Sequence, residues 1–247
     1  METLLALSNT VELVRSREEM PLMPERHPEP DRQPECELRR DLVRFSKWLY
    51  RLGYMPGTSG NLSVRLDRHR LLVTPTGCSK AMLRSDDMVI VDLHGRHIAG
   101  KRKVTSEVGM HLAIYNQRAD VEAVIHSHPP VATGFACAGR ALDEMICQEG
   151  AMTLGPVPLA RYATTGTPEV AASLAPHIPY HQAILMANHG AVSYGPTLLD
   201  AFLKMETLEH LAHIRLVTHQ LGSHDILRDD QLDQLVRARQ RYLLNAT

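Results

Sequence analysis

An apolar run that predicts a β-strand ends in two histidines, Val121-Glu122-Ala123-Val124-Ile125-His126-Ser127-His128. Side chains alternate between the two faces of a strand, so His126 and His128 point the same way. Two imidazoles on one face can bind one metal ion when a third ligand arrives from elsewhere in the fold. The stretch therefore predicts a buried strand that ends at a metal site.

A third histidine stands in a similar setting. His189 follows the apolar run Ile184-Leu185-Met186-Ala187 and precedes Gly190. Two strand ends that deliver three imidazoles would form an open zinc site, with a position left for a ligand. Manganese, iron or cobalt also accept imidazole ligands. The alternative is that these strands simply end in hydrogen-bonded histidines, which is the commoner situation for a lone histidine in a chain that has 14.

Glu107 follows Thr105 and Ser106 at the predicted start of a helix. One interpretation is structural: an acid in the first turn favours the helix dipole, with Ser106 or Thr105 as the N-cap. The other is catalytic, because a carboxylate beside a metal can move a proton at a carbon next to a metal-polarised carbonyl. The residue types alone favour the structural interpretation.

Three short segments have the composition of an anion-binding turn: Gly60-Asn61, Thr76-Gly77 and Thr105-Ser106. Each offers backbone N–H groups beside a hydroxyl or amide donor, which suits a phosphate. Each is also ordinary turn or cap chemistry. The sequence contains neither GxGxxG nor GxxxxGK[ST], the glycine-rich motifs of nucleotide-binding loops.

The composition argues against several classes of function. The chain has 247 residues, 44% of them apolar, and a formal net charge of -1, so it can bury a sizeable core and shows no general surface for nucleic acid or membranes. Aromatic residues make up 4%, too few for a base-stacking platform. The four cysteines form no CxxC pair and no secretory signal is evident, which predicts reduced thiols in a cytoplasmic protein.

Two parts of the chain differ in composition. Residues 1–34 are rich in proline and charge, so we expect an extended or disordered N-terminal arm, and residues 35–247 are expected to form a single domain. Apolar periodicity predicts helices near 35–52, 105–115, 131–138, 168–175, 198–221 and 229–243, and strands near 62–66, 71–74, 88–92, 121–126, 157–160, 184–188 and 192–195. Consecutive strands with helices before and after them indicate an α/β fold with a mixed or antiparallel sheet.

Five fragments, in this order, resemble the class II aldolase/adducin family: Gly57-Thr58-Ser59-Gly60-Asn61-Leu62-Ser63-Val64-Arg65, Thr74-Pro75-Thr76-Gly77, Thr105-Ser106-Glu107, His126-Ser127-His128 and Asn188-His189-Gly190. The resemblance spans roughly residues 36–220. It implies a three-layer α/β/α sandwich with a mainly antiparallel central sheet. It also implies a homotetramer with active sites at the subunit interfaces.

The resemblance assigns roles to the candidate residues. It implies that His126, His128 and His189 bind zinc and that Glu107 is the catalytic acid/base, which reverses the preference for a structural Glu107. It further implies that the substrate phosphate is held by Asn61, Thr76, Gly77, Thr105 and Ser106. Adducin-like members are scaffolds that lack the metal histidines, so the presence of all three indicates an enzyme.

The chemistry implied is that of a zinc-dependent aldolase. A ketose 1-phosphate, of the fuculose or deoxyribulose type, would chelate zinc through its C2 carbonyl and C3 hydroxyl oxygens. Zinc would act as a Lewis acid and stabilise the enediolate that forms when the C3–C4 bond breaks. Glu107 would move the proton to or from the three-carbon fragment. The products would be dihydroxyacetone phosphate and an aldehyde, and the phosphate contacts would position the reacting carbons.

Departures from the family pattern keep other reactions open. Fuculose-phosphate-type aldolases have a tyrosine about 15 residues before the segment matched by Arg161-Tyr162-Ala163-Thr164, where this chain has Cys147. A thiol is a poor substitute for a phenol that protonates an aldehyde oxygen. Tyr242 is a candidate for a tyrosine supplied by a neighbouring subunit.

Three other reactions run on the same scaffold. Ribulose-phosphate epimerases carry an aspartate where this chain has Ala151, which makes epimerisation less favoured. Methylthioribulose-phosphate dehydratases use a glutamate in this region, and Glu144 and Glu149 are nearby, although both are also ordinary loop acids. Decarboxylation of an oxo-tetronate phosphate is the third, and an adducin-like structural protein is the non-enzymatic alternative.

Overall fold

The computed structural model describes the backbone of residues 33–223 and 225–245, and side chains of the last helix up to residue 238. The chain divides into two units, Met1–Pro34 and Glu35–Thr247. The expected extended conformation of the N-terminal arm lies outside the described residues, as does the side chain of Tyr242. The second unit contains all of the candidate metal, acid/base and phosphate residues.

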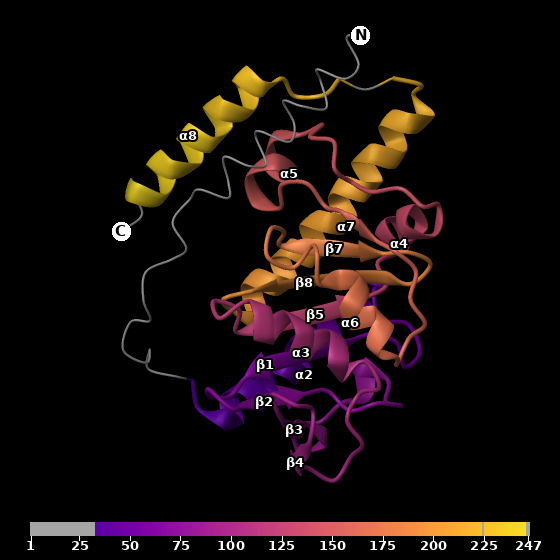
Figure 1. The fold of residues 1–247 in the computed structure, drawn as a ribbon, viewed down its shortest axis with the longest axis vertical. Helices are drawn as coiled ribbons and strands as arrows, with labels where there is room; N and C mark the ends of the chain where they lie inside the picture. The colour runs from indigo at the N-terminus through magenta and orange to yellow at the C-terminus, as the bar shows by residue number, and fades with distance from the viewer. Residues whose placement is uncertain (1–32, 224, 246–247) are drawn as a thin grey trace. The chain divides into compact units, whose positions relative to one another are not determined.

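An eight-stranded sheet lies at the centre of this unit (Figure 1). Its strand order is β4-β3-β2-β1-β5-β8-β7-β6, and every neighbouring pair is antiparallel except β6 and β7. The strands are β1 (Asn61–Arg65), β2 (Arg70–Val73), β3 (Val89–Asp92), β4 (His97–Ala99), β5 (Ala123–Ser127), β6 (Leu159–Ala160), β7 (Ala183–Met186) and β8 (Gly190–Gly195).

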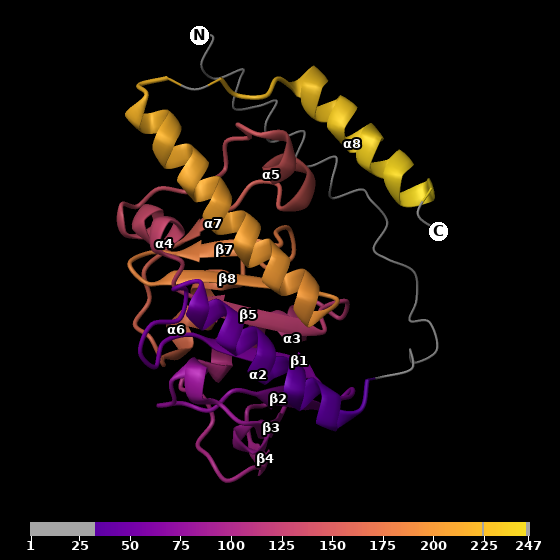
Figure 2. The same cartoon turned by 180° about the vertical axis from the view of Figure 1, so that it is seen from behind.

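Helices cover both faces of the sheet, because each face carries apolar side chains that must be buried. One face packs against α2 (Glu35–Arg51), α4 (Pro130–Cys137) and α7 (Leu198–Gln220), the helices in front in Figure 2. The other packs against α3 (Val108–Gln117) and α6 (Pro168–Leu174). The predicted three-layer α/β/α sandwich with a mainly antiparallel sheet is therefore confirmed.

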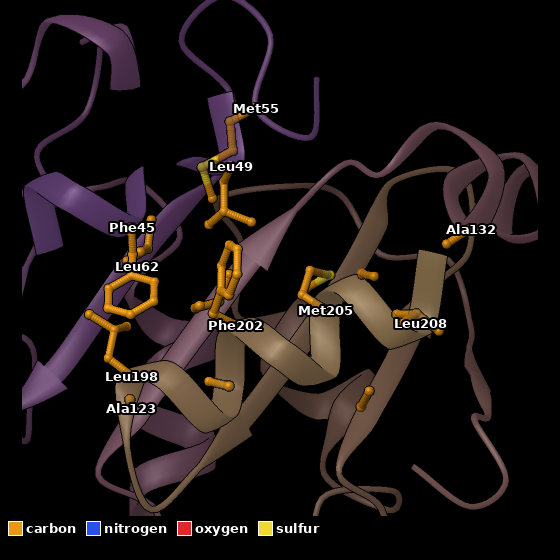
Figure 3. Packing of buried hydrophobic residues seen from close by; sticks show 14 of the residues in the cluster. Phe45, Leu49, Met55, Leu62, Ala123, Ala132, Leu198, Phe202, Met205 and Leu208 are labelled. Atoms are coloured by element: carbon orange, nitrogen blue, oxygen red, sulfur yellow. The ribbon is translucent and has the colours of Figure 1, made fainter. Parts of the chain in front are cut away.

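The helix α7 forms much of the larger core. Its side chains Phe202, Met205 and Leu208 belong to the apolar cluster shown in Figure 3, and the Phe202 ring lies 5.3 Å from the ring of Phe45 on α2. The helix is capped by Thr197, whose hydroxyl accepts from the backbone N–H of Asp200 at 3.0 Å, as a helix N-terminus requires. Within the described part of the chain, no helix has both the length and the apolar character needed to cross a bilayer.

Three local expectations differ from the structure. The edge strand β4 was not predicted, because all three of its residues are exposed and show no alternation. The short helix α5 (Gln148–Thr153) lies where a loop was expected, since six residues are too few to show helical periodicity. The helix expected near residue 105 begins at Val108, and Glu107 before it has non-helical backbone angles, φ -104° and ψ 16°. The remaining helix, α8, spans Asp229–Asn245.

Candidate active site

The three predicted metal ligands meet at one end of the sheet. His126 lies in β5, His128 follows that strand by one residue, and His189 lies in the connection between β7 and β8. One nitrogen from each imidazole lies within 4.8 Å of the others. His126 is fully buried, and the side chain of His189 is 11% exposed. The fold thus brings together ligands that are 63 residues apart in the sequence.

Each histidine is held by its local backbone. His126 Nδ1 lies 2.9 Å from the carbonyl oxygen of Ala191 on the neighbouring strand β8, so Nδ1 carries the proton and Nε2 keeps its lone pair. The backbone N–H of His128 donates to the carbonyl of Tyr54 at 2.8 Å. Asn188 takes the left-handed conformation, φ 57°, in the three-residue turn that presents His189, a conformation that asparagine tolerates.

Glu209 of α7 anchors the chain just after His128. Its two carboxylate oxygens accept hydrogen bonds from the backbone N–H groups of Val131 and Ala132, at 2.9 and 2.8 Å. These N–H groups belong to the first turn of α4, where a negative charge is favourable. The position of His128 is thereby tied to the packing of α7.

The three imidazoles fit a divalent metal. His126 Nε2 and His128 Nε2 lie 3.1 Å apart, and two lone pairs this close repel unless a proton or a cation lies between them. In a tetrahedral zinc site with bonds of about 2.0–2.1 Å, ligand nitrogens are about 3.3 Å apart. Burial lowers the pKa of His128 to about 3, with the neighbouring His126 and His189 adding to the effect. The neutral imidazole is the form that binds metals.

Gly190 is predicted to be essential for this arrangement because there is no space for a side chain. A Cβ atom at this position would lie 2.5 Å from His128 Cδ2 and 2.7 Å from the carbonyl oxygen of Ser127. Gly190→Ala is therefore expected to displace the His128 ring and to weaken zinc binding by about 10- to 100-fold, as loss of an outer-shell contact does. Calorimetric titration of the metal-free protein with zinc measures this effect.

A second glycine supplies the control. Gly134 lies in α4 with nothing within 4 Å of an added Cβ, so Gly134→Ala should leave zinc affinity unchanged and stabilise the helix by about 0.5–1 kcal/mol. Equal zinc affinity in Gly190→Ala and the wild type would show that the His128 ring does not depend on this contact.

Glu107 points at the three histidines. Its Oε1 lies 3.1 Å from His189 Nε2 and its Oε2 lies 3.4 Å from His126 Nε2. Asn61 Nδ2 donates to Oε2 at 2.8 Å, whereas Oε1 is buried and has no hydrogen-bond partner. The carboxylate therefore keeps one oxygen available on the side of the imidazoles.

The structural interpretation of Glu107 is corrected in one respect. The N-cap of α3 is Glu107 itself, not Ser106 or Thr105, and its carboxylate makes no capping hydrogen bond. The Thr105 hydroxyl instead accepts from the Glu107 backbone N–H at 3.3 Å. Burial raises the pKa of Glu107, but the adjacent His126 and His189 outweigh it and hold the pKa below its ordinary value. The carboxylate is therefore ionised in the folded protein.

The residues predicted to hold phosphate lie in two adjoining turns and one strand. The backbone N–H of Thr76 donates to the carbonyl of Lys103 at 3.1 Å, which brings the exposed Thr76-Gly77 turn beside Thr105 and the exposed Ser106. Asn61, at the start of β1, is 2% exposed and its amide contacts Glu107 and His111. A phosphate-binding role for these five residues stays a prediction.

Lys80 is a buried cation close to this site. It is 1% exposed, and its Nζ donates to the carbonyls of Thr58 and Cys78 at 3.2 and 3.1 Å. Burial lowers the pKa of Lys80 to about 8, an effect that the nearby Cys78 and Glu107 offset only in part. Lys80 therefore joins the loop before Asn61 to the loop after Thr76, and nothing in the local sequence pattern indicated its burial.

Two side chains of α3 were also missed. His111 is fully buried and contacts Asn61 and Ser63, and Tyr115 contacts Ser63. The signal was present in the sequence: Glu107, His111 and Tyr115 recur every four residues and so share one face of a helix. Only the packing of α3 against β1 shows that the polar side chains on this helix face lie beside the site.

The stability of the metal-free protein is expected to fall as the pH drops below about 6.5, the ordinary pKa of histidine. Burial, with the neighbouring His126 adding to the effect, lowers the pKa of His111 to about 3, although Glu107 partly offsets this. Below pH 6.5 the His111 imidazole is therefore protonated in the unfolded chain but stays neutral in the folded protein. For each pH unit by which the pH falls further, His111 alone lowers the free energy of unfolding by about 1.4 kcal/mol. Denaturant unfolding in chelator, between about pH 7 and pH 4, measures this.

The variant His111→Gln isolates the contribution of this residue, because glutamine does not titrate there. Its free energy of unfolding should depend less steeply on pH than that of the wild type, while the contribution of His128 is common to both proteins. Parallel curves for the two proteins would contradict the burial of a neutral His111.

The residues that bear on alternative reactions lie elsewhere. Cys147 is partly buried and packs against the apolar cluster that includes α7. Glu144 forms an ion pair with Arg215 of α7, and Glu149 is exposed in α5. Neither glutamate is among the residues that the structure brings to the three histidines.

A model of the class II aldolase and adducin N-terminal domain matches residues 40–216. The match covers well over half of the chain, and it includes every candidate metal, acid/base and phosphate residue. The chain therefore belongs to the class II aldolase and adducin family, as the resemblance of its motifs predicted.

Three similar proteins place the chain within this family. It is 34% identical over 212 residues to the 5-methylthioribulose-1-phosphate/5-deoxyribulose-1-phosphate aldolase of Rhodospirillum rubrum, with 85% of this chain and 94% of that protein covered. It is 35% identical over 178 residues to the 3-oxo-tetronate 4-phosphate decarboxylase of Haemophilus influenzae, covering 70% and 84%. A solved L-fuculose 1-phosphate aldolase superposes with a TM-score of 0.77 at 32% identity, covering 82% and 95%.

Proposed function

We propose that this protein is a zinc-dependent aldolase, a carbon–carbon lyase that cleaves a ketose 1-phosphate to dihydroxyacetone phosphate and an aldehyde. The observation that carries the proposal is the position of the Glu107 carboxylate, 3.1 and 3.4 Å from nitrogens of two of the three clustered histidines. The similarity to two ketose-phosphate aldolases supports it. A divalent metal held by His126, His128 and His189 would polarise the ketose carbonyl and stabilise the negative charge that develops on bond cleavage.

The substrate phosphate would bind away from the histidines. Backbone contacts of Thr76 with Lys103 and of Pro75 with Val104 bring the Thr76-Gly77 turn beside the Thr105-Ser106 segment, which immediately precedes Glu107 in the chain. Lys80 places a positive charge nearby. Binding energy from the phosphate would hold the three-carbon end of the ketose in register with the carboxylate.

Glu107 would carry the proton. When the C3–C4 bond breaks, the electron pair stays with the three-carbon fragment, and C3 then needs a proton to give dihydroxyacetone phosphate. The C4 hydroxyl loses a proton as the aldehyde forms, so the ionised Glu107 would take up that proton and then deliver it to C3 through Oε1, the carboxylate oxygen that lies 3.1 Å from His189 Nε2. In the synthetic direction the same oxygen would remove that proton.

A substrate screen read by product mass tests the proposal. Protein loaded with zinc, and separately with manganese, iron or cobalt, is incubated with fuculose, rhamnulose and 5-deoxyribulose 1-phosphates, with chelator as the control. Aldol cleavage gives two fragments, one of them dihydroxyacetone phosphate. Absence of turnover on the whole panel would overturn the proposal.

The same screen separates the alternative reactions, provided that a methylthioribulose-type phosphate and an oxo-tetronate phosphate are included. Dehydration removes one water, decarboxylation removes carbon dioxide, and epimerisation leaves the mass unchanged. Each of these outcomes would replace the aldolase assignment. An adducin-like scaffold would bind no stoichiometric metal, which elemental analysis of the purified protein detects.

We also propose a homotetramer with active sites at subunit interfaces, as the family resemblance implies, and a cytoplasmic location, as the cysteine pattern predicts. Light scattering coupled to gel filtration measures the assembly. A monomer that turns over substrate at full rate would contradict the shared active site.

A further inference from the structure

Five polar side chains form one hydrogen-bonded chain that leads away from the candidate active site: Glu107, Asn61, His111, Ser63 and Tyr115. Asn61 Nδ2 donates to Glu107 Oε2 at 2.8 Å, and Asn61 Oδ1 lies 2.5 Å from His111 Nε2. His111 Nδ1 lies 2.6 Å from Ser63 Oγ, which lies 2.9 Å from the Tyr115 hydroxyl. The four side chains beyond Glu107 are buried, where unpaired polar groups are costly.

The side chains of this hydrogen-bonded chain come from one face of α3 and one face of β1, which lie against each other. Glu107, His111 and Tyr115 lie four residues apart on one face of α3, and Asn61 and Ser63 lie two apart on one face of β1. The far end is anchored by Arg65, whose guanidinium lies 4.8 Å from the centre of the Tyr115 ring and donates to the Tyr115 carbonyl at 3.2 Å.

Only one direction of donation satisfies all four contacts. An ionised Glu107 can only accept, so Asn61 must present its NH2 group to the carboxylate and its oxygen to His111. His111 must then carry its proton on Nε2, which leaves the Nδ1 lone pair to accept from the Ser63 hydroxyl. Tyr115 in turn donates to Ser63. The reverse direction would turn the Asn61 oxygen toward the carboxylate oxygen at 2.8 Å, a repulsive contact.

We propose that His111 is a positioning residue that orients the amide of Asn61 and thereby holds the Glu107 carboxylate with Oε1 turned toward the three histidines. Asn61 donates to Oε2 at 2.8 Å, and the two carboxylate oxygens otherwise face His126 and His189, so Asn61 is the contact that holds the carboxylate from outside the histidine cluster. Burial keeps His111 neutral with a pKa of about 3, as its acceptor Nδ1 requires. The inference rests on the proposed function, in which Glu107 moves a proton.

Two substitutions at His111 separate positioning from bulk packing. His111→Leu fills much of the same volume but removes both hydrogen bonds, so kcat for ketose phosphate cleavage is expected to fall by about 10- to 100-fold, with zinc affinity unchanged. His111→Gln keeps a donor for Asn61 and an acceptor for Ser63, and should restore most of kcat. The matched control is Ser193→Ala, which removes a buried strand hydroxyl that donates to the Ala201 carbonyl at 2.7 Å and should leave kcat unchanged.

Loss of zinc together with kcat in His111→Leu, or no rescue by His111→Gln, would reduce His111 to a structural residue and overturn the proposal. If His111→Leu does not fold, Ser63→Ala serves instead, because it leaves the imidazole in place and removes only the hydroxyl that fixes its tautomer. An unchanged kcat in Ser63→Ala would count equally against the proposal.

A readout without substrate distinguishes failure of this inference from failure of the proposed function. Long-range proton–nitrogen correlation NMR of the wild type, with the His111 signals identified by their loss in His111→Gln, should find the proton on Nε2. A proton on Nδ1 would reverse the hydrogen-bonded chain and overturn the inference whether or not any ketose phosphate is cleaved. A wild type with the Nε2 proton and no turnover would instead contradict the proposed function.

Discussion

Replacing Glu107 with glutamine is expected to lower kcat for ketose phosphate cleavage by about 10²- to 10⁴-fold, the usual contribution of a positioned acid or base. The amide keeps the shape of the side chain, and its oxygen can still accept the 2.8 Å hydrogen bond from Asn61. It cannot carry a proton to C3, so the chemical step is lost while the site stays assembled. Zinc content should remain that of the wild type, because the three imidazoles are untouched.

A second glutamate provides the control for the helix-terminus interpretation. Glu169 lies in the first turn of α6 and is exposed, so Glu169→Gln removes the same kind of charge from a helix N-terminus without approaching the histidines. Glu169→Gln should lose at most about 1 kcal/mol of stability, and only Glu107→Gln should lose turnover. Full activity in Glu107→Gln would show that Glu107 is a structural acid after all.

The variant His126→Ala is expected to abolish stoichiometric zinc binding and, with it, turnover. His126 is the fully buried member of the three, and its hydrogen bond to the Ala191 carbonyl fixes which nitrogen faces the others. Two imidazoles remain, too few for a catalytic zinc site that uses three protein ligands. The loss of affinity should exceed the roughly 10- to 100-fold cost of removing an outer-shell partner, as measured by titration with zinc and by elemental analysis.

Two further histidine variants test whether the loss of zinc in His126→Ala is caused by misfolding. His189→Ala removes a ligand from a surface turn, so it should lose zinc without leaving a cavity in the core. His97→Ala removes an exposed histidine of the edge strand β4 and should keep both zinc and turnover. Stoichiometric zinc in both His126→Ala and His189→Ala would mean that the three histidines are not the metal site.

Local sequence patterns were sufficient for the individual parts of the site. Alternation along a strand places His126 and His128 on one face, and a glycine after a second apolar run marks the turn that carries His189. These conclusions hold because backbone geometry fixes where neighbouring side chains point, whatever the rest of the chain does.

Other elements lacked a local signal. The strand β4 is exposed throughout and the helix α5 has only six residues, so neither shows a hydrophobic period. The burial of Lys80 and the packing of Cys147 against the core also depend on segments distant in the chain. Burial is a property of the assembled layers, and no run of adjacent residues encodes it.

The sequence by itself determined the residue types, the strand and helix periods, and a set of motifs specific enough to indicate the family. Only the tertiary structure decided which of these side chains touch. The register of β1 on β5 places Asn61 opposite His126, and the docking of α3 places the Glu107 carboxylate between Asn61 and the histidines. The physical reason is that contacts across a sheet and between layers follow from strand pairing and core packing, which join residues far apart in the chain.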